Sequence, residues 1–181
     1  QYYDEVIKSN ALGADYALYQ KAIIDGLGGN YNDKIAGMKT LVTRFPSSGF
    51  ADDAIMQIGN TYLAQDKDEL AIEAFKSLFA KNPKSDQVPD AYLKLGLIYF
   101  NRDSYDESLS WYQKVVQYYP STPASNEAML AIKEIYIAKG DPAGYITYAN
   151  KYPGSKVTAS EQDSLVYLSA EKQFFNGDMD K

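Results

Sequence analysis

Residues 44–48 read Arg-Phe-Pro-Ser-Ser, residues 81–85 read Lys-Asn-Pro-Lys-Ser, and residues 118–121 read Tyr-Tyr-Pro-Ser. The prolines of these segments, Pro46, Pro83 and Pro120, are 37 residues apart. Two further sets of residues share this period, namely Ala17, Ala54, Ala91 and Ala128, and Tyr62, Tyr99 and Tyr136. Because several residue types recur with one period, the sequence predicts a repeat protein.

Each repeat carries the apolar pattern of two helices. In the second repeat the two stripes flank polar residues 65–67, and they consist of Ile55, Ile58, Gly59 and Tyr62, and of Ala71, Phe75 and Leu78. Spacings of three and four residues place such side chains on one face of an α-helix. Small residues at Gly59 and Ala71 fall where two helices must approach closely. The sequence therefore predicts an all-α fold of paired helices.

The period divides residues 1–181 into one solenoid with four whole units and two partial ones. The whole units are expected at 14–49, 50–86, 87–123 and 124–157, and the partial units at 1–13 and 158–181. Solenoids normally end in polar capping elements, and neither end has one. We therefore expect an excised piece of a longer array, whose exposed apolar ends would let it associate with itself.

Polar residues before the predicted helices indicate helix caps. Asp66, Asp103, Asp141 and Asp178 precede second helices, where a carboxylate can accept backbone N–H groups of the first turn. Residues 66–69 and 158–161 also have the spacing of a capping box.

Two repeats depart from the pattern. In the first, Lys21 and Asp25 stand where an apolar residue and a tyrosine are expected. In the fourth, Lys133 replaces the small residue, and the second helix, near Ala143 to Tyr152, is about one turn short. A shortened helix would alter the local stacking angle or leave an opening. This irregularity is either drift or has a function, and drift is the favoured interpretation.

The pattern of Gly59, Tyr62, Ala71, Phe75 and Pro83 resembles the tetratricopeptide repeat, and residues 96–120 match it again. Three extra residues after each proline resemble a subclass found in bacterial envelope proteins, such as outer-membrane assembly lipoproteins and periplasmic partners of the Tol-Pal system. The resemblance implies a right-handed α-solenoid of stacked antiparallel helix pairs, with first helices lining the concave side. It also implies a periplasmic or outer-membrane location, with the cytoplasm as the alternative.

Carrying over the groove positions of that family gives a candidate peptide-binding surface. Its residues are Tyr16, Tyr19, Ile23, Asp53, Met56, Asn60, Leu63, Asp90, Leu93, Leu97, Phe100, Asn101, Glu127, Leu130, Glu134 and Ile137. The centre of this surface is apolar and one edge is acidic, so a carboxylate ligand would be repelled. We expect an amphipathic peptide or protein with basic residues flanking an apolar core. The alternative is that these side chains contact neighbouring helices or an absent part of a longer protein.

Composition narrows the function. The chain has no histidine and no cysteine, which removes imidazole bases, thiol nucleophiles and the usual ligands of transition metals. Its 18 basic and 24 acidic residues give a net charge of −6, which disfavours nucleic acid. We predict a non-catalytic protein-interaction scaffold with no metal, no cofactor and no membrane span. A carbohydrate-binding surface that uses tyrosines and Trp111 as platforms is the alternative.

Overall fold

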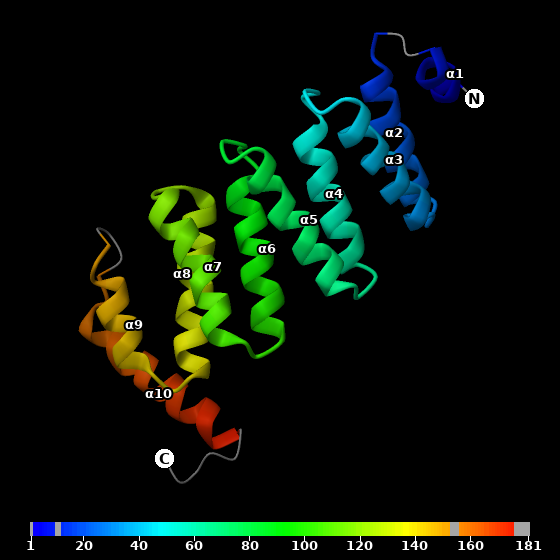
Figure 1. Ribbon diagram of the computed structural model, residues 1–181. Coiled ribbons are helices and arrows are strands. Elements are labelled where there is room, and N and C mark those ends of the chain that lie inside the picture. Colours follow the sequence, from blue (N-terminus) through cyan, green and yellow to red (C-terminus); the bar gives the residue numbers. More distant parts are fainter. Residues whose placement is uncertain (1, 10–11, 153–155, 176–181) are drawn as a thin grey trace. The chain divides into compact units, whose positions relative to one another are not determined.

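The computed structural model describes residues 2–9, 12–152 and 156–175, and all of its regular elements are helices (Figure 1). The first helices of the repeats are α2 (Ala14–Leu27), α4 (Ala51–Leu63), α6 (Val88–Asn101) and α8 (Pro123–Ala138). The second helices are α3 (Tyr31–Arg44), α5 (Asp68–Lys81), α7 (Tyr105–Tyr118) and α9 (Pro142–Ala149). Helix α1 (Tyr2–Ser9) precedes them and α10 (Ala159–Phe175) follows.

The helices form two compact parts, Gln1–Ala91 and Tyr92–Lys181. In the first part, α1 packs on α2, α2 on α3, α3 on α4, and α4 on α5. In the second part, α7 packs on α8, α8 on α9, and α10 on both α8 and α9. No strand occurs among the described residues, and helices adjacent in sequence pack on one another. The predicted all-α fold of stacked helix pairs is therefore confirmed.

The repeated prolines end the second helices. Helices α3, α5 and α7 each have 14 residues, and each ends one residue before a C-cap that precedes proline. These C-caps, Phe45, Asn82 and Tyr119, have φ values of −130°, −136° and −129°. Each also donates its N–H to the carbonyl four residues earlier. Proline cannot donate the next helical hydrogen bond and biases the preceding residue toward extended backbone, so it fixes where the unit closes.

The turn from first to second helix is a left-handed cap, which corrects one prediction. Gly29, Asp66, Asp103 and Gly140, spaced by 37 residues, all have positive φ, between 55° and 80°. After Asp66, the N–H of Lys67 bonds the Tyr62 carbonyl, as in a Schellman motif. The predicted helix-starting role of Asp66 and Asp103 is therefore wrong, because both residues close the preceding helix. Aspartate serves there because it tolerates left-handed backbone better than most residues.

Two other predicted caps are confirmed, whereas the capping box predicted at residues 66–69 is not, because the N-cap of α5 is Lys67 and it forms no side-chain cap bond. The Gly144 N–H donates to Asp141 Oδ1 at 2.8 Å, so Asp141 caps α9. Thr158 and Glu161 form the expected capping box, because each accepts the other's backbone N–H, at 3.3 and 2.8 Å. Asp178 lies outside the described residues.

Small residues on first helices face large rings on second helices. A Cβ atom added to Gly59 would lie 2.7 Å from Phe75 Cζ, and one added to Gly96 would lie 2.7 Å from Tyr112 Cζ. Phe75 is fully buried and Tyr112 nearly so. In the second part, the buried Ser108 hydroxyl also donates to the Gly96 carbonyl at 2.7 Å. The helices of a repeat therefore approach closely only because these glycines lack a side chain.

The fourth repeat packs differently. Helix α9 has eight residues against 14 in α7, so the predicted shortening is confirmed and is larger than one turn. Tyr148 of α9 is buried, with its ring 5.2 Å from that of Tyr152. Burial is the main cause that raises the pKa of Tyr148, and the neighbouring Tyr152 phenol raises it further. The two hydroxyls are nevertheless not placed to form a hydrogen bond. Among the described residues, the Tyr148 hydroxyl has no hydrogen-bond partner.

We expect Gly59→Ala to destabilise the protein by roughly 1–3 kcal/mol, measured as a loss of urea unfolding free energy. Alanine is intrinsically the better helix former, but its methyl group would overlap the buried Phe75 ring. Gly49→Ala is the control, because a Cβ atom there meets nothing within 4 Å. Restored stability in a Gly59→Ala, Phe75→Leu double variant would identify the overlap as the cause, and an undiminished Gly59→Ala protein would contradict it.

We expect Tyr148→Phe to leave stability unchanged or to raise it by up to about 1 kcal/mol, because it removes a buried hydroxyl that has no partner. Ser108→Ala is the contrasting variant, and it should cost about 1 kcal/mol because its hydroxyl is hydrogen-bonded. Equilibrium unfolding in urea measures both. Destabilisation by Tyr148→Phe as large as that by Ser108→Ala would show that the Tyr148 hydroxyl does have a partner.

Candidate functional site

The candidate groove residues all lie on first helices, and the two compact parts hold separate groups of them. Tyr16, Tyr19 and Ile23 are on α2, and Asp53, Met56, Asn60 and Leu63 are on α4. Asp90, Leu93, Leu97, Phe100 and Asn101 are on α6, and Glu127, Leu130, Glu134 and Ile137 are on α8. None lies on a second helix, as the repeat pattern predicts.

In the first part, the residue before α4 packs on two candidate tyrosines. The ring centroid of Phe50 is 5.6 Å from that of Tyr16 and 5.3 Å from that of Tyr19. Burial is the main cause that raises the pKa of Tyr19, and the nearby Asp53 carboxylate adds to it. Tyr19 is half-buried, so only part of its ring is available to a partner.

The equivalent contact one repeat later is a hydrogen bond. Gln87 lies 37 residues after Phe50, and its Nε2 donates to Asp53 Oδ1 at 2.7 Å. Burial raises the pKa of Asp53, and the carboxylates of Asp86 and Asp52 raise it further. Sequence reasoning missed Phe50 and Gln87 because neither is a groove position, although both stand just before a first helix. Three carboxylates thus gather at the start of α4, where an anionic ligand would be repelled.

Three of the candidate residues belong to the core. Met56, Leu93 and Ile137 are 6%, 7% and 4% exposed, so their side chains offer almost no surface to a partner. Leu93 packs in the apolar cluster that includes Tyr112 and Ile132. The prediction that these three side chains face a ligand is not supported, because the buried arc of each first helix is wider than the repeat pattern indicates.

In the second part, the first helices carry exposed leucines and exposed carboxylates. Leu97 on α6 is 42% exposed and Leu130 on α8 is 66% exposed. Glu127 and Glu134 flank Leu130 in the sequence of α8 and are exposed. Phe100 is half-buried, with its ring 5.8 Å from that of Tyr105 on α7. The exposed surface of the first helices therefore combines apolar and acidic side chains.

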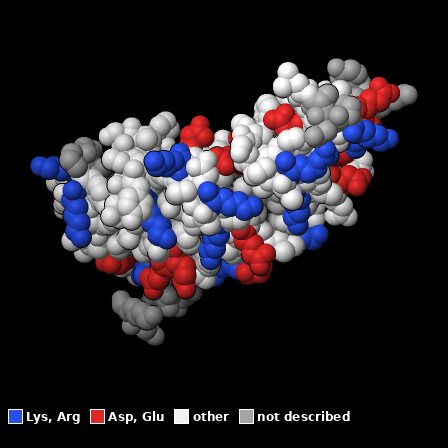
Figure 2. Space-filling model, turned by 45° about the horizontal axis from the view of Figure 1, so that its top comes forward, with Lys and Arg blue, Asp and Glu red and all other residues white. Residues whose placement is uncertain are grey.

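Charge on the face in Figure 2 is mixed. Lysine and arginine side chains are spread among uncharged ones, and acidic side chains form separate groups. Across the described residues, no group of three or more histidine, cysteine, aspartate or glutamate side chains could hold a metal ion. In the same residues, no helix has both the length and the apolar character that a membrane crossing needs.

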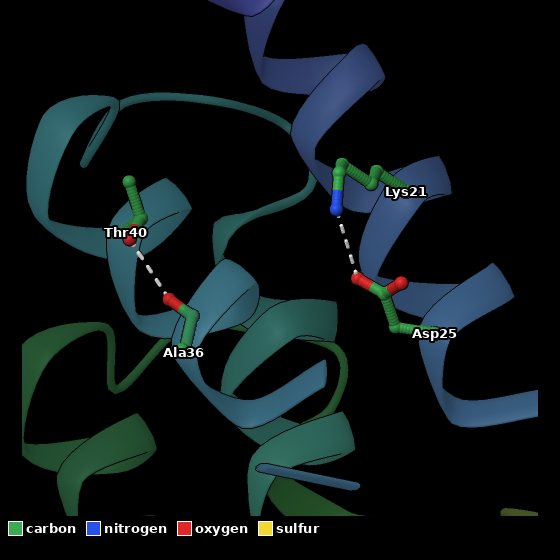
Figure 3. Close-up of polar contacts among 4 residues, drawn as sticks. All are labelled: Lys21, Asp25, Ala36 and Thr40. Atoms are coloured by element: carbon green, nitrogen blue, oxygen red, sulfur yellow. Dashed lines mark hydrogen bonds and ion pairs between the residues drawn. The ribbon is translucent and has the colours of Figure 1, made fainter. Parts of the chain in front are cut away.

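The first repeat replaces an apolar pair by an ion pair. Lys21 and Asp25 of α2 stand where α4 has Ile58 and Tyr62, and Lys21 Nζ lies 3.3 Å from Asp25 Oδ2 (Figure 3). On the neighbouring α3, the Thr40 hydroxyl donates to the Ala36 carbonyl at 2.8 Å, so it too has a partner. These polar groups all find partners within their own helices. The replacement of the apolar pair in the first repeat therefore needs no ligand to explain it.

The only tryptophan is not a free platform for a sugar. Lys114 Nζ lies 3.6 Å from the centroid of the Trp111 ring, and the Tyr92 ring centroid lies 5.7 Å from it. Trp111 is also half-buried. An ammonium group over an aromatic ring occupies the surface on which a sugar would stack.

Residues 53–85 and 90–122 each match the family model of the tetratricopeptide repeat. No curated protein matches the chain. A crystal structure of MamA is 22% identical, with a TM-score of 0.60 over 97% of this chain and 87% of that one. A crystal structure of a tetratricopeptide repeat protein from Parabacteroides merdae is 12% identical, with a TM-score of 0.66 over 90% of this chain and 61% of that one.

The structure of Naa15/Naa10 bound to HypK is also similar, with 14% identity and a TM-score of 0.53 over 93% of this chain and 26% of that one. At such identities the likeness concerns the fold. Residues 53–85 and 90–122 therefore match the tetratricopeptide repeat, and the chain has the fold of a tetratricopeptide-repeat α-solenoid.

Proposed function

We propose that the protein is a non-catalytic interaction module that binds a peptide or protein segment on the exposed face of its first helices. The observation that carries this proposal is the exposure of Leu97 and Leu130 at groove positions of first helices, with the exposed carboxylates of Glu127 and Glu134 on the same helix as Leu130. Single exposed leucines are ordinary, but both of these stand at groove positions of first helices, although at different places in the repeat, since Leu97 is equivalent to Glu134 and Leu130 to Leu93. Repeats of this family commonly mediate protein–protein contacts, and the similar Naa15/Naa10 structure contains bound HypK.

The charges on this face define the partner's chemistry. Asp53 and Asp90 on one part, and Glu127 and Glu134 on the other, would attract lysine or arginine side chains. The net charge of −6 acts in the same direction over longer distances. The partner is therefore a segment with an apolar centre and basic flanks, and added salt weakens its binding.

We expect fluorescein-labelled peptides with a leucine-rich centre and lysine flanks to bind more tightly than the same peptides with glutamate flanks. Anisotropy titrations at low and high salt measure this difference. Leu97→Ser should weaken the lysine-flanked peptide roughly five- to tenfold, because it removes apolar contact area. Leu70→Ser is the matched control, since Leu70 is 41% exposed but lies on a second helix.

Circular dichroism separates recognition from packing in this experiment. Helicity unchanged by Leu97→Ser, together with weaker binding, supports the proposal. Lost helicity would show that Leu97 is a packing residue, and equal effects of Leu97→Ser and Leu70→Ser would contradict a site on the first helices. Binding of glycans in preference to peptides would favour the carbohydrate alternative.

We also propose a bacterial cell-envelope location, in the periplasm or at the outer membrane. The support is the 37-residue period, with three residues more than the usual repeat of this family after each proline. Fractionation of cells that express the tagged protein measures this directly. Recovery in the periplasmic or outer-membrane fraction is expected, and recovery with cytoplasmic markers would overturn this part of the proposal.

A further inference from the structure

The shortened fourth repeat contains a cleft between α8, α9 and the start of α10. Its volume is 320 Å³, which is at the lower end of the range of about 300–1,000 Å³ for ligand sites. Its apolar walls are Met129, Leu130, Val157 and Leu165. Such an opening is what a second helix six residues shorter than α7 predicts.

Polar side chains from three segments converge on this cleft. They are Asn126 and Lys133 of α8, Tyr145 of α9, Lys156 before α10, and Glu161 of α10. The cleft thus holds two ammonium groups and one carboxylate. Its remaining polar groups, an amide and a phenol, can both donate hydrogen bonds.

Lys133 occupies a place that is small in every other repeat. The equivalent residues are Ala22, Gly59 and Gly96, and the last two lie against Phe75 and Tyr112. In the fourth repeat the residue equivalent to Phe75 and Tyr112 is Ala149, which is fully buried. In this repeat the small residue is therefore on the second helix instead of the first, and the lysine side chain lines the cleft. Lys133 is half-buried, so its ammonium group has lost part of its hydration. An anion that pairs with it would offset the cost of that loss.

The one carboxylate of the cleft is already engaged. Glu161 Oε2 accepts the Thr158 N–H and the Thr158 hydroxyl, both at 2.8 Å, as part of the α10 capping box. These two bonds are the main causes that lower the pKa of Glu161, and Lys133 contributes least. Among the described residues, no ion pair of 4.0 Å or less involves Lys133 Nζ. The cleft therefore carries excess positive charge next to an apolar wall.

We propose that this cleft binds a peptide carboxylate that has an apolar side chain next to it. Lys133 and Lys156 pair with the carboxylate, Asn126 and Tyr145 donate hydrogen bonds to it, and the apolar wall contacts the neighbouring side chain. Burial is the main cause that raises the pKa of Tyr145, with Glu161 adding to it, so the phenol keeps its proton at neutral pH. This site shares Leu130 with the proposed partner surface but differs from it in the charge that it selects, because the acidic side chains of that surface attract basic residues.

Three labelled hexapeptides test the proposal. The first ends in Ala-Leu with a free carboxylate, the second is its C-terminal amide, and the third is an amide with glutamate before the leucine. We expect the amide to bind at least tenfold more weakly than whichever carboxylate source the cleft accepts, a terminus or a side chain. Equal binding of all three, or binding of none, would overturn the proposal. Inorganic phosphate that competes as well as the acid peptide would also overturn it, because phosphate has no apolar part.

Lys133→Met is the decisive variant, because it keeps the stem of the side chain and removes its charge. The ratio of acid to amide affinity should fall about tenfold, and Lys156→Ala should lower it as well. Lys139→Met is the matched control, since Lys139 follows α8, pairs with Asp106 and does not line the cleft. A ratio unchanged in Lys133→Met would refute the site. Binding of the lysine-flanked peptides, and its sensitivity to Leu97→Ser, would be unaffected by that result.

Discussion

The close approach of two helices within each repeat is the constraint on which the other features depend. Gly59 and Gly96 leave room for the Phe75 and Tyr112 rings, and a methyl group at either glycine would overlap the ring. Close-packed interiors tolerate little change in volume, so this pairing fixes the distance between first and second helix. The positions from which the groove residues of a repeat project follow from that distance.

The fold could be predicted well from the sequence because its signals are local and repeated. Proline ends the second helices α3, α5 and α7 by backbone chemistry alone, and the apolar stripes place the core on the correct faces. The predictions that failed depended on information that the local pattern does not contain. Aspartate can cap a helix or adopt left-handed backbone, and the residue type at Asp66 or Asp103 fits both. The burial of Met56, Leu93 and Ile137 depends on how widely neighbouring helices cover each face, which spacing does not encode.

A repeat keeps the places of its contacts while their chemistry changes. Phe50 packs on Tyr16 by ring contact, and 37 residues later Gln87 bonds Asp53 by a hydrogen bond at the corresponding place. The backbone period preserves which positions meet, whereas the side chains decide whether the contact is apolar or polar. The surface of a solenoid can therefore vary from repeat to repeat without altering the helix packing beneath it.

The fourth repeat shows what happens when the packing itself changes. Lys133 takes the small position of α8 and Ala149 takes the large position of α9, so the order of small and large residues is reversed. The shorter α9 then leaves the cleft open instead of covering it. Reversed packing and a shortened helix are independent changes in sequence, and together they bring a lysine to the edge of an apolar cleft. That coincidence is the argument for the proposed site, against the drift that the sequence alone favours.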